Sequence, residues 1–390
     1  MKTAGTKWSL LVIWVLCIII IVSAGSPAYG RQVTDMAGRT VTIGQARKVW
    51  PAYPPLMHLV YAIDPSLLVG WTMPLSAANS KYIQAPQRNL PVIGGWFGQR
   101  TPNLENLAAA GPDFALAWDQ TIAARPNMVE TLGKLNIPVL AVRLFRLSDY
   151  PDALRFLGDV LNREERSREL RNYIEQTIAE MKRFGGSIAK EKKVSVYYAI
   201  GPDGLTNDCD HMPFLNEAID LAGGRNVYQC RPADRMMGKK IDMERLLIFD
   251  PEVIITQDTI FFSRVYSDPR YRLLKAVKNH RVYMIPGTPF NWLNYPPTYM
   301  RALGIRWLAK MLYPGLYTAD LRRETKLFFK LFLRVDIGDD DTDEILLLKT
   351  NVRSRRPMEH TDSHTGNDGR KVSENRYSKK NHQGSDNDQL

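Results

Sequence analysis

The chain has 390 residues, a formal net charge of +11 and 44% hydrophobic residues. This length and apolar content suffice for two domains of ordinary size. The positive charges are spread along the chain, with no basic block interleaved with aromatic residues, so the composition argues against a nucleic-acid-binding protein. A basic surface instead favours anionic ligands or anionic lipid headgroups.

The first thirty residues have the three parts of a secretory signal. Lys2 and Lys7 supply positive charge, residues 8–22 are apolar and uncharged, and residues 23–30 are small and rich in helix breakers. We therefore expect residues 1–30 to be a signal peptide and the mature protein to be periplasmic. The apolar run is shorter than the ~20 residues of a membrane-spanning helix. An uncleaved N-terminal anchor is the open alternative.

Export to an oxidising compartment bears on the cysteines. Cys17 lies in the signal, which leaves Cys209 and Cys230 in the mature chain. Such a pair predicts a disulfide bond, worth about 3 kcal/mol on the chain-entropy account. Two reduced, buried thiols are the alternative.

The mature chain opens with a hairpin and continues as alternating strands and helices. Residues 34–43 predict the hairpin, with Ala37-Gly38 at its turn. Apolar runs alternate with helical patterns up to residue 162, which favours parallel α/β units covered on both faces. This is the predicted N-terminal lobe, residues 31–162. Its expected strands are 47–50, 67–71, 91–95, 114–118 and 139–142.

A long charged segment follows, with Leu170, Ile174 and Ile178 at helical spacing. It predicts a linker helix over residues 163–186, ended by Gly185-Gly186. A continuous helix between two lobes resists hinge bending, so we expect lobe closure to be small.

Strands and helices alternate again over residues 187–337, the predicted C-terminal lobe. Its expected strands are 193–200, 253–256 and 281–285, and its expected helices are 214–222, 243–249, 272–277, 299–312 and 321–333. Residues 338–390 are acidic and then polar, with few apolar residues after Lys349. We expect this tail to be disordered.

Five segments, in this order, resemble the periplasmic binding proteins for iron-siderophores and cobalamin, the type with a helical inter-lobe linker. They are Asp35-x-x-Gly-Arg-x-Val, Asn103-Leu104-Glu105 before Gly111-Pro112-Asp113, residues 243–247 before Asp250-Pro251, residues 276–283, and residues 307–314. The resemblance implies two Rossmann-like lobes joined by a long α-helix, a ligand cleft between them, and no catalysis. It also implies a monomer that delivers its ligand to an ABC import permease.

The resemblance gives a role to two carboxylates. Glu105 and Glu244 each begin a helix, one in each lobe, and in such proteins glutamates at these places pair with arginines of the permease transmembrane subunits. Carboxylates are stabilised at helix N-termini and form oriented bonds to arginine. The alternative is an ordinary first-turn glutamate that stabilises its own helix.

In doubly wound sheets, ligands bind outside the carboxyl ends of the strands. Aromatic walls with a few polar groups suit a large chelate, and guanidinium groups suit its anionic oxygens. Some of these aromatic residues could instead cap the core, and Arg100 could be solvated. The residues selected by this rule are Tyr53, Trp96, Phe97, Arg100, Trp118 and Arg143 in the first lobe, and Gln257, Phe290 and Trp292 in the second.

Direct metal binding by side chains has weak support. His58 fits a packed histidine better than a ligand, and Asp208-Cys209-Asp210-His211 would lose its thiolate to a disulfide. We therefore expect no cofactor of the protein's own, and a prechelated metal as cargo. A ferric siderophore is the first hypothesis, and a nickel or cobalt chelate, haem or cobalamin the second. A periplasmic chelatase-like enzyme is the remote third, because no catalytic motif such as His-Glu-x-x-His or Gly-x-Ser-x-Gly occurs.

Overall fold

The structure, a computed structural model, describes residues 30–207, 212–229, 239–293 and 298–353. These residues all fall in one compact unit. Most of the predicted signal peptide, both Cys209 and Cys230, and residues 354–390 lie outside the described residues. No helix in the described ranges is both long enough and apolar enough to span a bilayer.

The predicted N-terminal hairpin is confirmed. Strands β1 (Arg31–Thr34) and β2 (Thr40–Ile43) pair antiparallel, and Gly38 at the turn has a φ of 80°. The Asp35 carboxylate organises the turn, since it accepts the Ala37 and Arg39 N–H groups at 3.0 and 2.9 Å. It also accepts the Ala141 N–H at 2.9 Å, which fastens the hairpin to the neighbouring sheet.

The first lobe is built on a parallel sheet in the order β3-β4-β5. These strands are continuous apolar runs that are buried on both faces, as expected for parallel strands covered by helices. The predicted strands at 67–71 and 91–95 form only isolated bridges, from Leu68 to Val49 and from Trp71 to Val92. The elements are β3 (Val49–Pro51), α2 (Pro54–Ile63), η1 (Pro65–Leu67), α3 (Ala77–Ser80), α4 (Ala85–Arg88), α5 (Leu104–Ala110), β4 (Phe114–Trp118), α6 (Asp119–Ala124), α7 (Asn127–Lys134), β5 (Val139–Val142), η2 (Leu147–Asp149) and α8 (Tyr150–Leu161).

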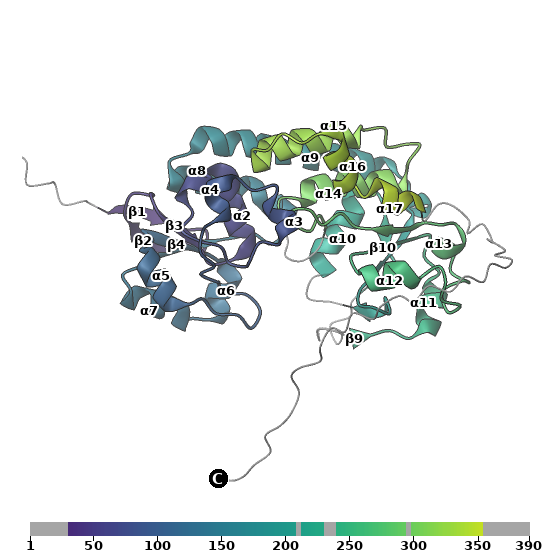
Figure 1. Ribbon diagram of the computed structural model, residues 1–390, viewed down its shortest axis with the longest axis horizontal. Helices are drawn as coiled ribbons and strands as arrows, with labels where there is room; N and C mark the ends of the chain where they lie inside the picture. Colours follow the sequence, from purple (N-terminus) through teal and green to yellow (C-terminus); the bar gives the residue numbers. More distant parts are fainter. Residues whose placement is uncertain (1–29, 208–211, 230–238, 294–297, 354–390) are drawn as a thin grey trace, which may run out of the picture. The chain divides into compact units, whose positions relative to one another are not determined.

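The second lobe is built on a four-stranded parallel sheet in the order β11-β10-β6-β8. Its strand β10 and helices α10, α12 and α13 are drawn in teal to green in Figure 1. A short antiparallel pair, β7 with β9, stands beside it. The elements are η3 (Lys190–Lys192), β6 (Ser195–Ala199), β7 (Thr206–Asn207), α10 (Met212–Leu221), β8 (Arg225–Asn226), β9 (Lys239–Lys240), α11 (Met243–Phe249), β10 (Val253–Thr256), α12 (Thr259–Arg264), α13 (Lys275–Lys278), β11 (Val282–Met284) and α14 (Arg301–Leu312).

Helix α9 (Glu164–Ser187) connects the two lobes. It packs against α8 and α2 of the first lobe and against α10 and α14 of the second. The predicted bounds of this helix, 163–186, differ by one residue at each end from those observed, and Gly185 and Gly186 lie within its last turn rather than after it. Gly185 lies directly against the last carbonyl groups of α10, where a side chain would not fit. The fold class, two α/β lobes joined by a long helix, is confirmed.

One apolar core contains residues of both sheets, and a smaller one around Trp50 and Trp96 lies in the first lobe. The C-terminal segment adds to the connection between the lobes. Its π-helix reaches back to α2, where the Tyr61 hydroxyl donates to the Leu333 carbonyl at 3.3 Å and Arg334 donates to the Ile63 carbonyl at 2.7 Å. The segment comprises α15 (Leu321–Phe328), the π-helix η5 (Phe329–Leu333), α16 (Asp339–Ile345) and α17 (Leu348–Arg353).

The expectation of disorder from residue 338 onward is wrong for residues 338–353, which fold as α16 and α17. Asp339 and Asp341 pair with Lys326 and Lys81, while Ile345 is buried. The Asn351 amide then bonds both backbone groups of Met284 on the edge strand β11, at 2.9 and 3.2 Å. Because this segment is rich in aspartates, its amphipathic pattern was not recognised in the sequence.

The two glycines of α9 provide a matched test of how closely the linker packs. A Cβ at Gly185 would lie 2.8 Å from the Asp220 carbonyl oxygen, whereas one at Gly186 meets nothing within 4 Å. We expect Gly185→Ala to destabilise the protein by about 1–3 kcal/mol through overpacking. Gly186→Ala should be neutral or stabilise it by up to ~1 kcal/mol through helix propensity. Urea unfolding of both variants checks this, and equal midpoints would contradict the packing.

Candidate functional site

Three aromatic rings form a continuous stack at the carboxyl edge of the first sheet. Tyr53 follows β3, Trp118 ends β4 and Phe145 follows β5. The Tyr53 and Trp118 rings are 4.9 Å apart and inclined by 8°, and the Trp118 and Phe145 rings are 6.1 Å apart and inclined by 12°. We call these three rings the aromatic stack. The structure thus brings together two residues that the sequence selected and one, Phe145, that it missed.

Tyr53 is 2% exposed and lies in the core, so the half-buried Trp118 and Phe145 provide the accessible surface of the stack. Trp118 also carries a polar atom. Its side chain is half-buried, and its indole N–H is buried without a hydrogen-bond partner in the described part of the chain. A buried donor normally finds an acceptor. The stack therefore combines a partly exposed flat surface with a buried, unpartnered indole N–H group.

The second pair of aromatic residues in the first lobe, Trp96 and Phe97, has one ring in the core and one at the surface. Trp96 is 7% exposed and packs edge-on against Trp50 in the smaller apolar core, with ring centres 5.6 Å apart. Phe97 is half-buried, and the exposed Arg100 guanidinium lies 5.7 Å from its ring centre. Phe97 and Arg100, rather than Trp96, provide the accessible surface of this loop.

Arg143 is exposed and is held by neighbouring groups. It donates to the Met36 carbonyl at 3.1 Å and lies 3.7 Å from the Asp119 carboxylate. Burial raises the pKa of Asp119, which is the first residue of α6. Arg143 therefore extends from the same edge of the sheet as the aromatic stack, with one acidic neighbour.

At the carboxyl edge of the second sheet, Gln257 and Asn291 are joined by a hydrogen bond from the Asn291 amide. Trp292 is fully buried, and its indole N–H donates to the Thr288 carbonyl at 3.0 Å. Phe290 is 8% exposed and stacks on the His58 ring of the first lobe, with centres 3.6 Å apart. Phe290 thus contacts the first lobe directly, and Trp292 belongs to the core.

His58 is a neutral, buried histidine between the lobes. It is 2% exposed, and burial lowers its pKa to about 3. Its Nδ1 atom has no hydrogen-bond partner among the residues described, and the same holds for the hydroxyl of Tyr299, whose ring centre lies 6.3 Å away. The charged form of His58 is unfavourable here because burial removes its hydration.

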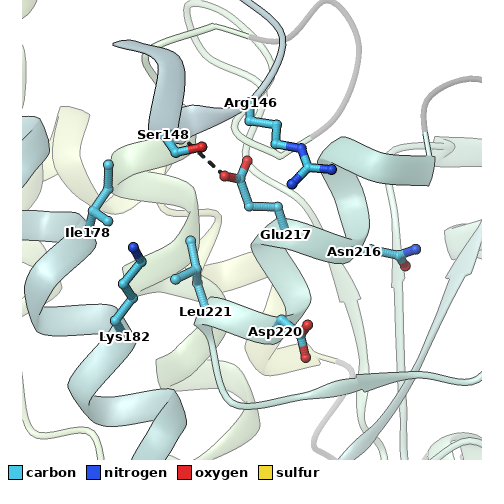
Figure 2. A pocket seen from close by; sticks show the side chains of 8 residues that line it. All are labelled: Arg146, Ser148, Ile178, Lys182, Asn216, Glu217, Asp220 and Leu221. Carbon is cyan, nitrogen blue, oxygen red and sulfur yellow. Dashed lines mark hydrogen bonds between the residues drawn. The ribbon is translucent and has the colours of Figure 1, made fainter. Parts of the chain in front are cut away.

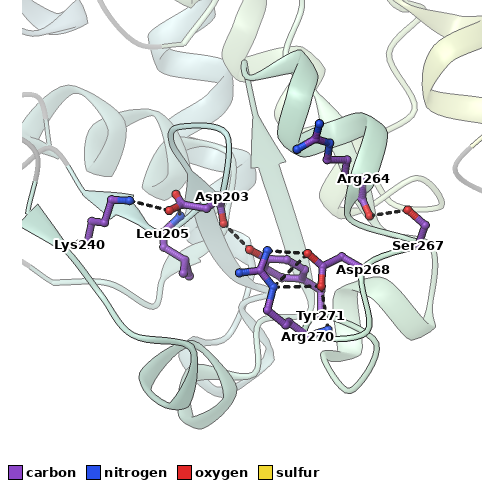
Figure 3. Close-up of polar contacts among 8 residues, drawn as sticks. All are labelled: Asp203, Leu205, Lys240, Arg264, Ser267, Asp268, Arg270 and Tyr271. Carbon is purple, nitrogen blue, oxygen red and sulfur yellow. Dashed lines mark hydrogen bonds and ion pairs between the residues drawn. The ribbon is translucent and has the colours of Figure 1, made fainter.

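Beyond the end of β6, the second lobe presents a polar cluster that is satisfied internally (Figure 3). The Lys240 ammonium lies 2.7 Å from the Asp203 carboxylate and, as the leading cause, holds the pKa of that carboxyl below its usual value. The Tyr271 hydroxyl donates to the Asp203 carbonyl, and Arg270 pairs with Asp268 at 2.6 Å. These charges are already matched within the cluster.

A cavity of about 550 Å³ lies where α9 and α10 meet the η2 turn (Figure 2). Its lining combines cationic and acidic side chains, and Glu217 accepts a hydrogen bond from the Ser148 N–H at 3.3 Å. The lining residues are Arg146, Ser148, Ile178, Lys182, Asn216, Glu217, Asp220 and Leu221.

Helices α5 and α11 occupy equivalent places in the two lobes. Each has seven residues, with an exposed glutamate at the second position, Glu105 or Glu244. An Asn103 or Asp242 side chain caps each helix at its start. Both glutamates are therefore displayed from rigid first turns of similar geometry.

In the described ranges, no group of three or more His, Cys, Asp or Glu side chains is placed to hold a metal ion. The candidate Asp208-Cys209-Asp210-His211 cluster and the Cys209–Cys230 disulfide lie outside those ranges, so both remain predictions.

Residues 78–289 match the periplasmic binding protein family. The chain belongs to this family. A solved ABC transporter solute binding protein from Sulfurospirillum deleyianum is 33% identical, with a TM-score of 0.74 over 81% of this chain and 98% of that one. The molybdate-binding protein MolA of Haemophilus influenzae is 26% identical over 304 residues, which are 66% of this chain and 84% of MolA. The ABC transporter substrate-binding lipoprotein YvrC of Bacillus subtilis is 21% identical over 333 residues, 81% of this chain and 99% of YvrC.

Membership fixes the general function. Periplasmic binding proteins of ABC transporters capture solutes and are not enzymes, and the two-lobed fold with parallel sheets is that of the solved relatives. The carboxyl edges of the two sheets, where the aromatic stack lies, are the expected place for a solute in such folds.

The burial of His58 predicts acid sensitivity. Its folded pKa of about 3 lies below the unfolded value of 6.5, so the unfolded state binds the extra proton between these limits. Stability should therefore fall as the pH drops below 6.5, and from pH 7.5 to 5.5 His58 should account for a loss of about 1.4 kcal/mol. We expect His58→Leu to lose this share of the pH dependence and His280→Asn to retain it. Urea unfolding at the two pH values measures the effect, and equal slopes for wild type and His58→Leu would contradict it.

Proposed function

We propose that this protein is an exported receptor that binds a metal chelate, with a ferric siderophore as the first candidate, and delivers it to an ABC import permease. The observation that carries the proposal is the aromatic stack at the carboxyl edge of the first sheet. Flat, partly apolar chelates are recognised by aromatic walls and a few directed polar groups. The half-buried Trp118 and Phe145 rings, backed by the buried Tyr53 ring, offer such a wall.

Charge supports an anionic cargo. The chain carries a net charge of +11, and Arg100 and Arg143 extend from loops at the same edge of the sheet. Guanidinium groups match carboxylate and catecholate oxygens in geometry and charge. Phe97 beneath Arg100 adds an apolar surface on which a ring of the chelate can rest.

A nickel or cobalt chelate, haem or cobalamin would use the same aromatic surface. A small oxoanion is a different candidate, favoured by the similarity to MolA, which binds molybdate. An oxoanion requires several converging donors rather than flat apolar area. The aromatic stack therefore favours the chelate, and the two classes separate in a binding assay.

Trp118 provides that assay. Titration of residues 31–353 with ferric siderophores, nickel–histidine, haem, cobalamin and molybdate should give sub-micromolar tryptophan quenching by one class of chelate. Trp118→Ala should weaken this affinity about tenfold or more, because it removes the central ring of the stack. The buried Trp71 serves as control, since Trp71→Phe should leave affinity unchanged. Binding of molybdate alone, or full affinity in Trp118→Ala, would reject the chelate site.

The paired glutamates give a second test. We propose that Glu105 and Glu244 dock on arginines of the permease, because both are exposed on capped first turns of equivalent helices. Charge-assisted bonds to arginine require the carboxylate, so the double variant Glu105→Gln, Glu244→Gln should lose uptake in cells and keep ligand affinity.

The control for this experiment is Glu164→Gln with Glu165→Gln, two exposed first-turn glutamates of α9. This control should preserve both uptake and affinity. If the Glu105 and Glu244 variant lost affinity as well, the two residues would belong to the ligand site or the core, and the docking role would be refuted.

A further inference from the structure

Glu217 on α10 of the second lobe makes three contacts that reach across to the first lobe or to α14. Its carboxylate accepts the Leu147 N–H at 2.7 Å and the Ser148 N–H at 3.3 Å, both at the η2 turn of the first lobe. It also lies 3.5 Å from the Arg301 guanidinium. A single side chain therefore ties a helix of one lobe to the loop that follows β5 in the other (Figure 2).

Arg301, the first residue of α14, completes this connection. Its side chain is 1% exposed, and it donates to the Phe145 carbonyl at 3.3 Å. The guanidinium also lies 5.7 Å from the ring centre of Tyr150. Arg301 thus holds the backbone of the residue whose ring ends the aromatic stack.

The loop between β5 and α8 is accordingly held from both sides. Asp149, within the loop, accepts the Phe145 and Arg146 N–H groups at 2.8 and 2.7 Å. From the second lobe, Arg301 donates to the Phe145 carbonyl and Glu217 accepts the Leu147 and Ser148 N–H groups. With its backbone fixed in this way, the Phe145 ring remains parallel to Trp118.

We propose that Glu217 and Arg301 are positioning residues for the ligand site, which place Phe145 against Trp118 and make ligand affinity depend on the contact between the two lobes. This inference rests on the proposed function, because it assigns the pair a role at the aromatic stack.

Energetics favour a positioning role over a purely stabilising one. A buried ion pair loses much hydration, and replacing it by apolar residues of similar volume is often neutral or stabilising. Removing only one partner leaves an uncompensated charge and is costly. The pair therefore adds little net stability but defines one geometry, and a preorganised site gains affinity by avoiding the cost of ordering on binding.

The test compares Arg301→Lys and Glu217→Gln with a matched control on the same helix. Arg306 is also buried and ion-paired, to Glu180 and Glu324 at 2.9 and 3.2 Å, but contacts no residue of the aromatic stack. The first readout needs no ligand. It is the indole N–H cross-peak of Trp118 in tryptophan-labelled protein, assigned with Trp118→Phe and compared with its position in Phe145→Leu.

We expect the Trp118 cross-peak in Arg301→Lys and Glu217→Gln to move toward its Phe145→Leu position, and Arg306→Lys to leave it in place. One compound among ferric siderophores, nickel–histidine, haem and cobalamin is expected to bind the wild type. The first two variants should bind that compound about tenfold more weakly. A merely structural role would lower the urea midpoints of Arg301→Lys and Arg306→Lys alike and leave both affinities at the wild-type value.

A Trp118 cross-peak at the wild-type position in both pair variants would overturn the inference. If a lone buried charge prevents either variant from folding, the double variant Glu217→Leu, Arg301→Met removes both charges, and the same cross-peak is read in it. If the wild type bound none of these compounds, the proposed function would be refuted. The position of the Trp118 cross-peak, which is measured without ligand, would still test the positioning role.

Discussion

The parallel pairing of β3, β4 and β5 is the constraint on which the candidate site depends. In the observed register Pro51 lies opposite Leu116, so that Tyr53 and Trp118, each two residues further on, emerge side by side. Trp118 in turn lies opposite Val142, and the chain then turns at Phe145. A shift of the register by one residue would direct alternate side chains to the opposite face and separate the three rings. The aromatic stack is thus a product of strand pairing rather than of any local motif.

Several elements connect the two lobes firmly. Helix α9 packs on both, a single apolar core contains residues of both sheets, and the C-terminal segment contacts α2 before it ends on β11. The stack of His58 on Phe290 and the Glu217–Arg301 pair add further contacts between the lobes. Hinge motion needs a few residues that can absorb large changes in backbone angles, and a continuous helix resists such changes. We infer that the ligand meets a site that is largely formed beforehand.

Much of this architecture could be predicted from the sequence, for physical reasons that particular segments illustrate. The strands at 114–118 and 253–256 were predicted with their observed bounds because they are apolar runs buried on both faces. The helices at 104–110 and 243–249 likewise have side-chain caps at their starts and left-handed residues at their ends, which the sequence shows as Asn103, Asp242 and Gly111. Such signals depend only on neighbouring residues, so they can be recognised in the sequence without knowledge of the fold.

What could not be predicted depends on contacts between distant segments. Phe145 joins the aromatic stack from a loop that Arg301 and Glu217, from far along the chain, contact. Gly185 is required within the last turns of α9 because α10 leaves no room for a side chain there. The aspartates of α16 are folded because Lys81, Arg322 and Lys326 neutralise them. Neither the periodicity nor the composition of a segment identifies the distant residues that contact it.

The central claim is that a chelate binds to two lobes that are already fixed in place. Small-angle X-ray scattering of residues 31–353, free and saturated with the chelate that quenches tryptophan fluorescence, tests it most directly. The account predicts that the two scattering curves superimpose. A clear decrease in the radius of gyration on binding would show that the lobes close around the ligand and would contradict a preformed site.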